Sequence, residues 1–331
     1  MIKIVYAASW LARRRFYSFS HALYRECCEW SEPGVWGGRE VISLRGNPLL
    51  KYPHAFLVAM EEGRIMARML VGCVDGRGYF SMFDAEENEE AVRLLMTEAA
   101  AWQKRRGVRQ MIGPIAPHPL DLGGGVLIEG FEGPAAFGDA YNAPYYDKLL
   151  IRAGAIPYQE QAAYHVSKRW FDEEKYRRVS EWAKKRFGYE VRDGMTDSPR
   201  VLTDAICGIM GDEADREGMA CAIGSVWPCI LKEMCPVVCA EGRPIGYLLT
   251  IRSPRKHGEC ARIVTMWVHE AWRRKGVTAL LFDEAARAMI EMGIEEIDAS
   301  WVRTDNEASI RSIENAGGSA VRRYRMYLVQ I

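Results

Sequence analysis

The chain has 331 residues, of which 49% are hydrophobic, and its 44 Lys and Arg balance its 44 Asp and Glu, so the formal net charge is zero. This length suits about two domains of ordinary size, each able to bury a core. The charge balance lacks the basic excess that nucleic acids and anionic membranes usually require, and no apolar run reaches the ~20 residues of a membrane span.

The cysteine pattern argues against a metal site or a disulfide framework. The nine cysteines are odd in number and lie mostly in apolar stretches. Neither the adjacent Cys27 and Cys28 nor the spacing of Cys235 and Cys239 matches a zinc pattern, and the sequence contains no C-x-x-C. We therefore expect reduced thiols, no metal and a cytoplasmic location.

The first half of the chain predicts strands and helices in alternation. The opening "IKIVYA" is typical of a strand rather than of a targeting peptide. Residues 56–71 form two apolar runs around a Glu-Gly-Arg turn, which predicts a hairpin. The periodic segment 91–108 predicts a helix that ends at a glycine and leads into a strand at 108–115. A further helix is expected over 141–155.

The stretch 113–142 interrupts this pattern. It contains Gly123, Gly124 and Gly125, four prolines and little periodicity. A segment of this length without regular structure is unusual inside a compact domain. Two interpretations stay open: a wall or lid on the substrate side of a site, or a packed surface loop.

The second half repeats the order of the first. We expect an amphipathic helix, a hairpin with a second Glu-Gly-Arg turn, a helix, a strand and a helix over 172–186, 236–250, 277–294, 294–302 and 305–318, respectively. The segment 91–108 aligns with 277–294 without a gap, and the flanking elements match in the same order, which indicates duplication. The joint near Ser167 predicts two domains, 1–167 and 168–331.

A basic turn precedes the helix expected at 277–294. The strand-like "ARIVTMWV" ends at Val268, and Arg273, Arg274, Lys275 and Gly276 follow before the helix begins. Unpaired N–H groups and partial positive charge at a helix N-terminus suit a phosphate, and glycine lets the backbone approach closely. G-x-x-x-x-G-K-[ST] and G-x-G-x-x-G are absent, which disfavours Walker-type and dinucleotide sites. The turn is therefore expected to bind a diphosphate.

This turn resembles the pyrophosphate-binding segment of the GNAT superfamily of acyl-CoA-dependent N-acyltransferases. In "VHEAWRRKGVTALL", Arg273, Gly276 and Thr278 occupy the pattern Arg/Gln-x-x-Gly-x-Gly/Ala, with threonine in place of the usual small residue. "RTDNEASIRSIENAGG" resembles the fourth helix of the family and places Asn306 where a cofactor contact is common. The resemblance implies a cofactor site made of Trp267, Val268, Arg273, Arg274, Lys275, Gly276, Val277, Thr278 and Asn306.

Nearly the full chain resembles a poorly characterised group of double-GNAT proteins, through "NPLLKYPHAFLVA", "GPIAPHPLDLGGGVLIEGF", "YNAPYY" and "SWVRTDN" with "YRMY". The resemblance implies an α/β fold of the α+β kind, with two tandem GNAT-like domains. Each domain would be a mixed, mostly antiparallel sheet flanked by helices.

The two copies differ where the cofactor would bind. Aligned without a gap, residues 273–278 fall on 87–92, and this part of the first copy reads "MFDAEENEEAV". Acidic side chains favour the helix N-terminus itself but repel a pyrophosphate, at about 1 kcal/mol or more for each close pair. We expect a degenerate first domain without CoA and one cofactor site per chain.

The resemblance also implies the reaction. An amine attacks the thioester of an acyl-CoA, most simply acetyl-CoA, and a backbone N–H at the Trp267–Val268 edge polarises the thioester carbonyl. The amine must lose a proton to a base, and an acid can protonate the leaving thiolate. We expect a small-molecule or peptide amine as acceptor, and neither a nucleic-acid nor a membrane partner.

The usual acid of the family, a tyrosine four residues before the patterned glycine, is replaced by Ile313. Tyr324 is a substitute candidate acid and Glu259 a candidate base, with His257 and His269 nearby. An alternative function follows from Ile313: a CoA-binding or interaction protein that has lost catalysis.

Overall fold

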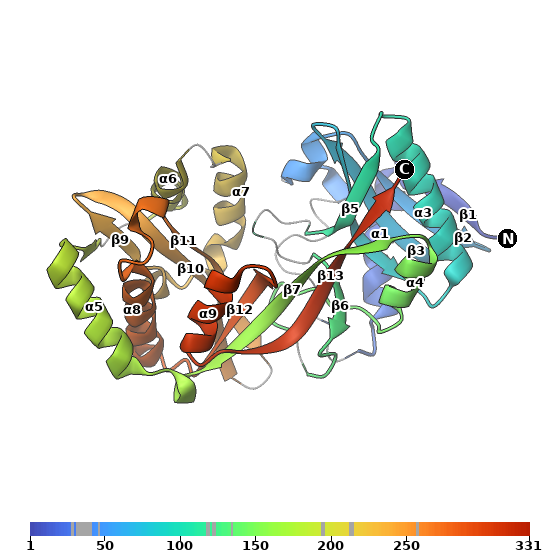
Figure 1. The fold of residues 1–331 in the computed structure, drawn as a ribbon. Helices are drawn as coiled ribbons and strands as arrows, with labels where there is room; N and C mark the ends of the chain where they lie inside the picture. Colours follow the sequence, from blue (N-terminus) through green and yellow to red (C-terminus); the bar gives the residue numbers. More distant parts are fainter. Residues whose placement is uncertain are drawn as a thin grey trace. The chain divides into compact units, whose positions relative to one another are not determined.

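The computed structural model describes residues 1–27, 30, 42–45, 47–116, 120, 124–133, 135–192, 196–211, 215–255 and 258–331, with 48, 254, 255, 258 and 259 described by their backbone only. The chain forms two compact units. Unit 1 comprises Met1–Gln161 and the C-terminal Arg322–Ile331, and unit 2 comprises Ala162–Val321. Strands and helices alternate in both (Figure 1).

The sheet of unit 1 has the strand order β1-β2-β3-β4-β5-β13, and β6 also pairs with β13. The pairs β1–β2, β2–β3, β3–β4, β5–β13 and β6–β13 are antiparallel, and the pair β4–β5 is parallel. The strands are β1 Lys3–Tyr6, β2 His54–Glu61, β3 Arg64–Val74, β4 Arg77–Ala85, β5 Gln110–Ile115, β6 Val126–Glu129, the first half of β7 Ile156–Ser167 and the end of β13 Ser319–Gln330. The helices are α1 Trp10–Leu23, α3 Glu89–Lys104, α4 Tyr146–Arg152 and the 3-10 turn η1 Pro48–Lys51.

Strand β2 is buried on both faces. Leu57 and Ala59 belong to the core that α3 covers, whereas Phe56 and Val58 pack in the cluster that contains Phe16 of α1. Successive side chains of a strand point to opposite faces. Because helices cover both faces, every central position of β2 is apolar, which explains the continuous run "AFLVAM".

Strand β13 completes the sheet of unit 1 from the far end of the sequence. Tyr327 is fully buried in the unit 1 core, and its strand pairs antiparallel with β5. Arg325 donates hydrogen bonds to Glu160 at 2.6 Å and to Asp147 at 2.9 Å. The chain therefore passes into unit 2 within β7, at Gln161 rather than near Ser167, and returns at Arg322.

The sheet of unit 2 has the strand order β7-β12-β11-β10-β9-β8. Strands β11 and β12 are parallel, and the pairs β10–β11, β9–β10 and β8–β9 are antiparallel. Besides β7, the strands are β8 Glu190–Val191, β9 Val237–Ala240, β10 Arg243–Arg255, β11 Gly258–Val268 and β12 Glu296–Arg303. The helices are α5 Glu173–Phe187, α6 Pro199–Met210, α7 Arg216–Val226, α8 Val277–Glu291 and α9 Glu307–Asn315.

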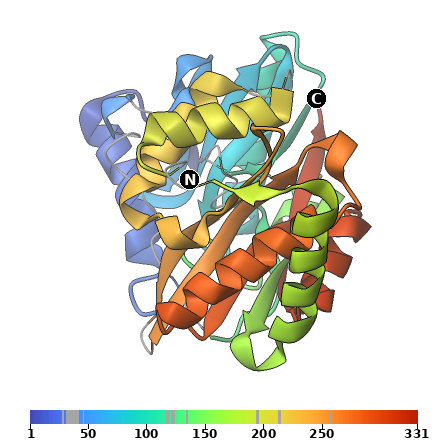
Figure 2. The same cartoon turned by 90° about the vertical axis from the view of Figure 1, so that its left-hand side faces the viewer.

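Helices cover both faces of this second sheet. In Figure 1 its strands lie between α6 and α7 on one side and α5 and α8 on the other. Figure 2 shows α5 packed beside α8. Short 3-10 turns connect elements in the described part of this unit, namely η2 Lys168–Trp170, η4 Trp227–Cys229, η5 Lys232–Met234 and η6 Glu270–Trp272.

These elements confirm the predicted fold class of two mixed, mostly antiparallel sheets flanked by helices. The hairpin expected at 56–71 is β2–β3, and the helix expected at 277–294 is α8. The stretch 113–142, for which two interpretations stay open, contains regular structure among its described residues. Strand β6 lies within it and pairs with β13, and the backbone N–H of Leu127 donates to Oδ1 of the buried Asn142 at 2.6 Å.

Replacing Tyr327 with alanine should destabilise unit 1 by about 3–5 kcal/mol, because a buried ring leaves a cavity. Hydrogen exchange followed by mass spectrometry should show loss of protection in α3 while α8 is unchanged. The control is Val321→Ala, at an exposed position of the same strand, which should cost less than about 1 kcal/mol. Loss of protection in α8 before α3 would contradict the assignment of β13 to unit 1.

Candidate functional site

The turn before α8 leaves the N-terminus of that helix open. Arg274 and Gly276 both have left-handed backbone conformations, with φ of 60° and 84°. Gly276 is the N-cap and offers no side chain to the helix. The first three N–H groups of α8 have no acceptor among the described residues, and Leu280 donates the first intrahelical bond, to the Gly276 carbonyl at 3.1 Å. Unpaired N–H groups and the helix dipole at such an end are suited to an anion.

Gly276 is required by its backbone and by a neighbouring helix. A Cβ on this residue would lie 2.7 Å from the Cβ of Ala183 in α5. Its φ also lies in the region that residues with a Cβ rarely adopt. The sequence suggested that the missing side chain leaves room for a phosphate. In the structure, the missing side chain also leaves room for the close approach of α5. The non-glycine Arg274 at positive φ is strained as well, by roughly 1–3 kcal/mol, which is typical of functional turns.

A cavity of about 280 Å³ opens at this turn. Six of the nine expected cofactor residues line it: Val268, Arg273, Arg274, Gly276, Val277 and Thr278. Ser312 and Asn315 of α9 and Tyr176 of α5 line it too, although no sequence pattern indicated them. Burial raises the pKa of Tyr176, and the charge of Asp172 adds to the effect. Tyr176 therefore remains a neutral hydroxyl beside the basic turn.

The other expected residues lie around this cavity. The guanidinium of Arg273 lies over the ring of Trp267 at 5.7 Å, and its Nε donates to the Val268 carbonyl at 3.1 Å. Lys275 lies over the ring of Trp272 at 5.1 Å. Asn306 is the N-cap of α9, where its Oδ1 accepts from the Ser309 N–H at 3.2 Å, and it does not line the cavity.

Strands β11 and β12 form a fork beside the cavity. They pair only where residues 260–263 face 296–299, yet β11 continues to Val268 and β12 to Arg303. The pairing of β10 with β11 skips Val264, which is therefore a bulge, and a bulge bends a strand. Trp267 and Val268 end the β11 arm of this fork, so the backbone edge of that arm is open towards β12 among the described residues.

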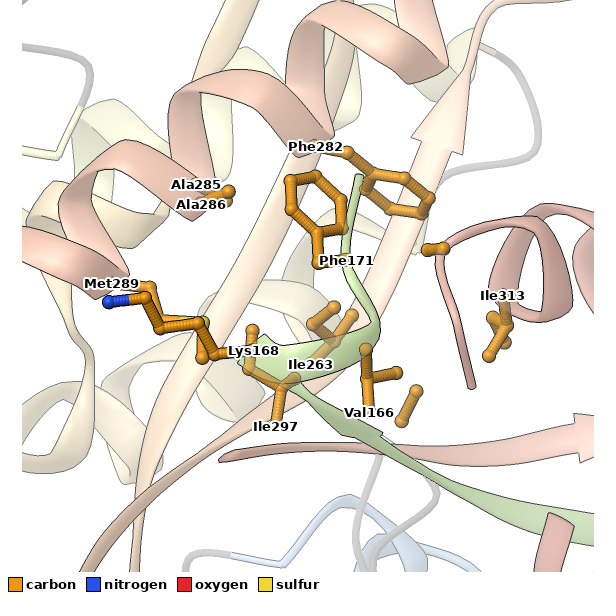
Figure 3. A pocket seen from close by; sticks show the side chains of 12 residues that line it. Val166, Lys168, Phe171, Ile263, Phe282, Ala285, Ala286, Met289, Ile297 and Ile313 are labelled. Carbon is orange, nitrogen blue, oxygen red and sulfur yellow. The ribbon is translucent and has the colours of Figure 1, made fainter. Parts of the chain in front are cut away.

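An apolar pocket lies along α8 beside the paired base of the fork (Figure 3). Its volume is about 50 Å³. The lining residues are Val166, Lys168, Phe171, Ile263, Phe282, Ala285, Ala286, Met289, Ile297, Ala299, Ile313 and Ala316. Phe282 also lines the cavity at the basic turn, so the two spaces adjoin. Ile313, at the position of the usual family acid, is part of this apolar lining.

The opposite face of the same strands carries a polar cluster. Along β12, Asp298 and Ser300 alternate with the pocket residues, so they point to the other face. Nδ1 of His165, from β7, lies 3.0 Å from Oδ1 of Asp298, and the Cys260 thiol lies 3.4 Å from Oδ2. The fully buried Arg262 donates to the Ser300 carbonyl at 3.3 Å. His165 and Asp298 are 133 positions apart, and no sequence pattern joins them.

The expected catalytic residues belong to both units, and two of them have side chains outside the described atoms. Tyr324 belongs to unit 1, where it is fully buried and its hydroxyl donates to Asp139 at 3.3 Å. Glu259 lies at the start of β11, and its side chain is outside the described atoms, as is all of His257. His269 caps the turn η6, where its Nδ1 accepts from the backbone at 3.3 Å.

The corresponding region of unit 1 is closed. Only residues 86–88 connect β4 to α3, against 269–276 in unit 2. Asn88 caps α3 with its own side chain, 2.9 Å from the Ala91 N–H. At the end of β4, the Ala85 N–H donates to the Tyr146 hydroxyl at 2.8 Å, and Tyr145 donates to the Ala85 carbonyl at 2.9 Å. Burial raises the pKa of Tyr145 to about 12, so it stays a donor.

Comparisons with known proteins agree with this fold. Residues 216–317 match the acetyltransferase (GNAT) family. Protein YghO of Escherichia coli (strain K12) is 22% identical over 96% of this chain and 93% of its own. A tandem GNAT protein from the clavulanic acid biosynthesis pathway superposes with a TM-score of 0.65 at 12% identity, covering 100% of this chain and 98% of its own. A GCN5-related N-acetyltransferase from Sphaerobacter thermophilus gives 0.56 at 13% identity, covering 99% and 95%.

The two units, each with helices on both faces of a mixed sheet, therefore define a tandem GNAT fold. The GNAT family match lies within the second half of the chain, and the fold of the whole chain is similar to that of tandem GNAT proteins. Within the described ranges, no helix has the length and apolarity to cross a bilayer, and no three His, Cys, Asp or Glu side chains are grouped as metal ligands.

Gly276→Ala should destabilise the protein more than Gly293→Ala, at the other end of α8. Both glycines have positive φ, but the space around Gly293 is open, whereas a Cβ at 276 meets Ala183. Strain alone costs roughly 1–2 kcal/mol, and overpacking adds roughly 1–3 kcal/mol. Thermal unfolding should therefore give the lower midpoint for Gly276→Ala, and equal midpoints would show that the contact with α5 is not tight.

Proposed function

We propose that this protein is an acyl-CoA-dependent N-acyltransferase whose unit 2 binds the acyl-CoA and whose acceptor is a small-molecule or peptide amine. The observation that carries the proposal is the uncapped N-terminus of α8, with its basic turn and adjoining cavity, beside the open end of the β11–β12 fork. The family match over this region supports the same activity. Free thiols at the described cysteines support a cytoplasmic location.

The residues present fit an acyl-CoA. The N–H groups of Val277, Thr278 and Ala279 would hold the diphosphate, and Arg273 and Arg274 would add positive field. Bound acyl-CoA supplies an activated acyl group as a thioester, of which acetyl is the simplest. The open backbone edge near Trp267 and Val268 would polarise the carbonyl, as an oxyanion hole does.

His165 is the base that the geometry favours on the acceptor side. Asp298 orients its ring from 3.0 Å, and both lie on the face opposite the apolar pocket. In the reaction, the amine nitrogen forms a bond to the acyl carbon while the carbon–sulfur bond breaks. His165 would take the proton that the nitrogen loses, and the leaving sulfur would gain a proton. The earlier candidates Tyr324 and Glu259 stay predictions.

Unit 1 is proposed to bind no acyl-CoA. The side chain of Asn88 satisfies the helix end that a diphosphate would need, and Tyr145 and Tyr146 occupy the backbone groups of Ala85. Glu89 in the first turn of α3 adds negative charge. The Asn88 cap, the tyrosine hydrogen bonds at Ala85 and the charge of Glu89 each act against the binding of an anion. The short connection between β4 and α3 also contains no basic turn.

A CoA-binding protein without catalysis is the alternative function. Ile313 favours it, because this residue and its neighbour Ala316 line an apolar pocket where the family usually has a tyrosine acid. Both functions require binding of CoA, so turnover separates them. Binding without thiol release across a broad amine panel would favour the alternative.

Coenzyme A should bind once per chain, and Thr278→Glu should weaken binding at least about tenfold, which is ~1.4 kcal/mol. A carboxylate at this position favours the helix N-terminus but repels a diphosphate, so thermal stability should be unchanged or higher. Thr278→Val, which keeps the shape without the charge, is the control and should bind within about threefold of wild type. Isothermal titration that finds two equal sites would contradict the closed state of unit 1.

His165→Gln and Asp298→Asn should lower the rate of thiol release by about a hundredfold, the usual contribution of a general base, with CoA affinity unchanged. The wild-type rate should rise with pH as the base loses its proton, and His165→Gln should remove that rise. His54→Gln in unit 1 is the matched control and should keep the wild-type profile. An unaltered pH profile in His165→Gln would exclude His165 as the base.

A further inference from the structure

The apolar pocket along α8 has no role in holding a diphosphate or an acetyl group. It lies next to the cavity at the basic turn, with Phe282 lining both. It also reaches Ile263 and Ala299, the last paired residues before β11 and β12 diverge. Figure 3 shows Phe171 and Phe282 at one end and Met289 and Lys168 at the other. From Phe282 to Met289 the helix advances about two turns, or ~10 Å.

The pocket lining suits hydrocarbon and disfavours water. It presents no polar surface, and ordered water needs about two to four polar partners. The polar side chains of this region, among them Asp298 and His165, lie on the opposite face of the sheet. Lys168 contributes to the lining but is exposed as a whole. A dry cavity of this kind binds apolar groups.

The volume sets the length of the occupant. The pocket has a volume of about 50 Å³. A water-sized group needs roughly 10–15 Å³ on the same measure, so roughly three to five such groups fit. An acetyl group would leave this space empty. A chain of roughly five to seven carbons would fill it, with its first two carbons outside the pocket and the other three to five inside.

We propose that the acyl group carried by this protein is an apolar chain of medium length, near six carbons, which lies in the pocket formed by α8, α9, β11 and β12. This inference rests on the proposed function, because the chain must be attached to a carrier held at the α8 N-terminus. It adds the class of acyl donor, which neither the family match nor the basic turn specifies. Ile313 then has a positive role as part of the wall of the acyl pocket.

Titration with a series of acyl-CoA thioesters tests the proposal without any acceptor. The dissociation constant should fall about fourfold per methylene from acetyl- to hexanoyl-CoA, the effect expected for a buried methylene, and should stop falling beyond about octanoyl-CoA. A constant affinity along the series would overturn the proposal. Tighter binding of glutaryl-CoA than of pentanoyl-CoA would also overturn it, because it would mean that Lys168 pairs with a carboxylate in the pocket.

Substitutions that fill or enlarge the pocket should shift the preferred acyl-chain length in opposite directions. Ala286→Leu places a larger side chain in the lining. It should weaken the binding of hexanoyl-CoA at least tenfold, while the affinity for acetyl-CoA should change less than about threefold. Met289→Ala lengthens the pocket and should move the optimum to a longer chain. Ala220→Leu, the same change at an exposed position of α7, is the matched control and should leave the whole series unchanged.

The two proposals fail in different ways. If coenzyme A and every thioester fail to bind, the proposed function is wrong. If coenzyme A binds but Ala286→Leu and Ala220→Leu both show the wild-type dependence of affinity on chain length, only the proposal of an acyl pocket is wrong. Thermal unfolding of each variant shows whether a lost affinity reflects a lost fold.

Discussion

The account of this protein depends on one backbone feature: a helix that begins with its N–H groups unpaired. Most helices close that end with a side chain, as Asn88 does for α3. Helix α8 begins instead at Gly276, whose left-handed conformation and contact with Ala183 fix the turn without capping it. Unpaired donors near a buried helix end are unfavourable unless solvent or a ligand satisfies them. The turn therefore suits an anion, and the roles proposed for the adjoining fork and pocket depend on that proposal.

Duplication gives an internal comparison, because one fold occurs in an open and a closed form. The closed form shortens the connection, caps the helix and bonds both backbone groups of Ala85 to tyrosines of α4. The helix cap and the tyrosine hydrogen bonds stabilise unit 1, since they satisfy backbone polar groups whose counterparts in unit 2 are left open. Unit 1 also takes the end of β13 into its sheet, so the C-terminal end of the sequence contributes to the fold of the first half.

Local sequence patterns predicted the helices, the strands and the basic turn, because hydrophobic periodicity and capping residues act within a few positions of the sequence. They did not predict contacts that join distant segments. Ala183 lies in α5, far from Gly276 in sequence, and nothing in the turn indicates that α5 presses on it. His165 meets Asp298 only because β7 pairs beside β12. Asn306 matched a family position, yet the structure uses it as a helix cap and places Asn315 at the cavity instead.

A crystal structure of the full chain with coenzyme A tests the central claim most directly. The account predicts the diphosphate within hydrogen-bond distance of the N–H groups of Val277, Thr278 and Ala279, with the start of α3 still capped by Asn88. A diphosphate bound elsewhere, or a side chain closing the α8 N-terminus in the presence of excess coenzyme A, would contradict it.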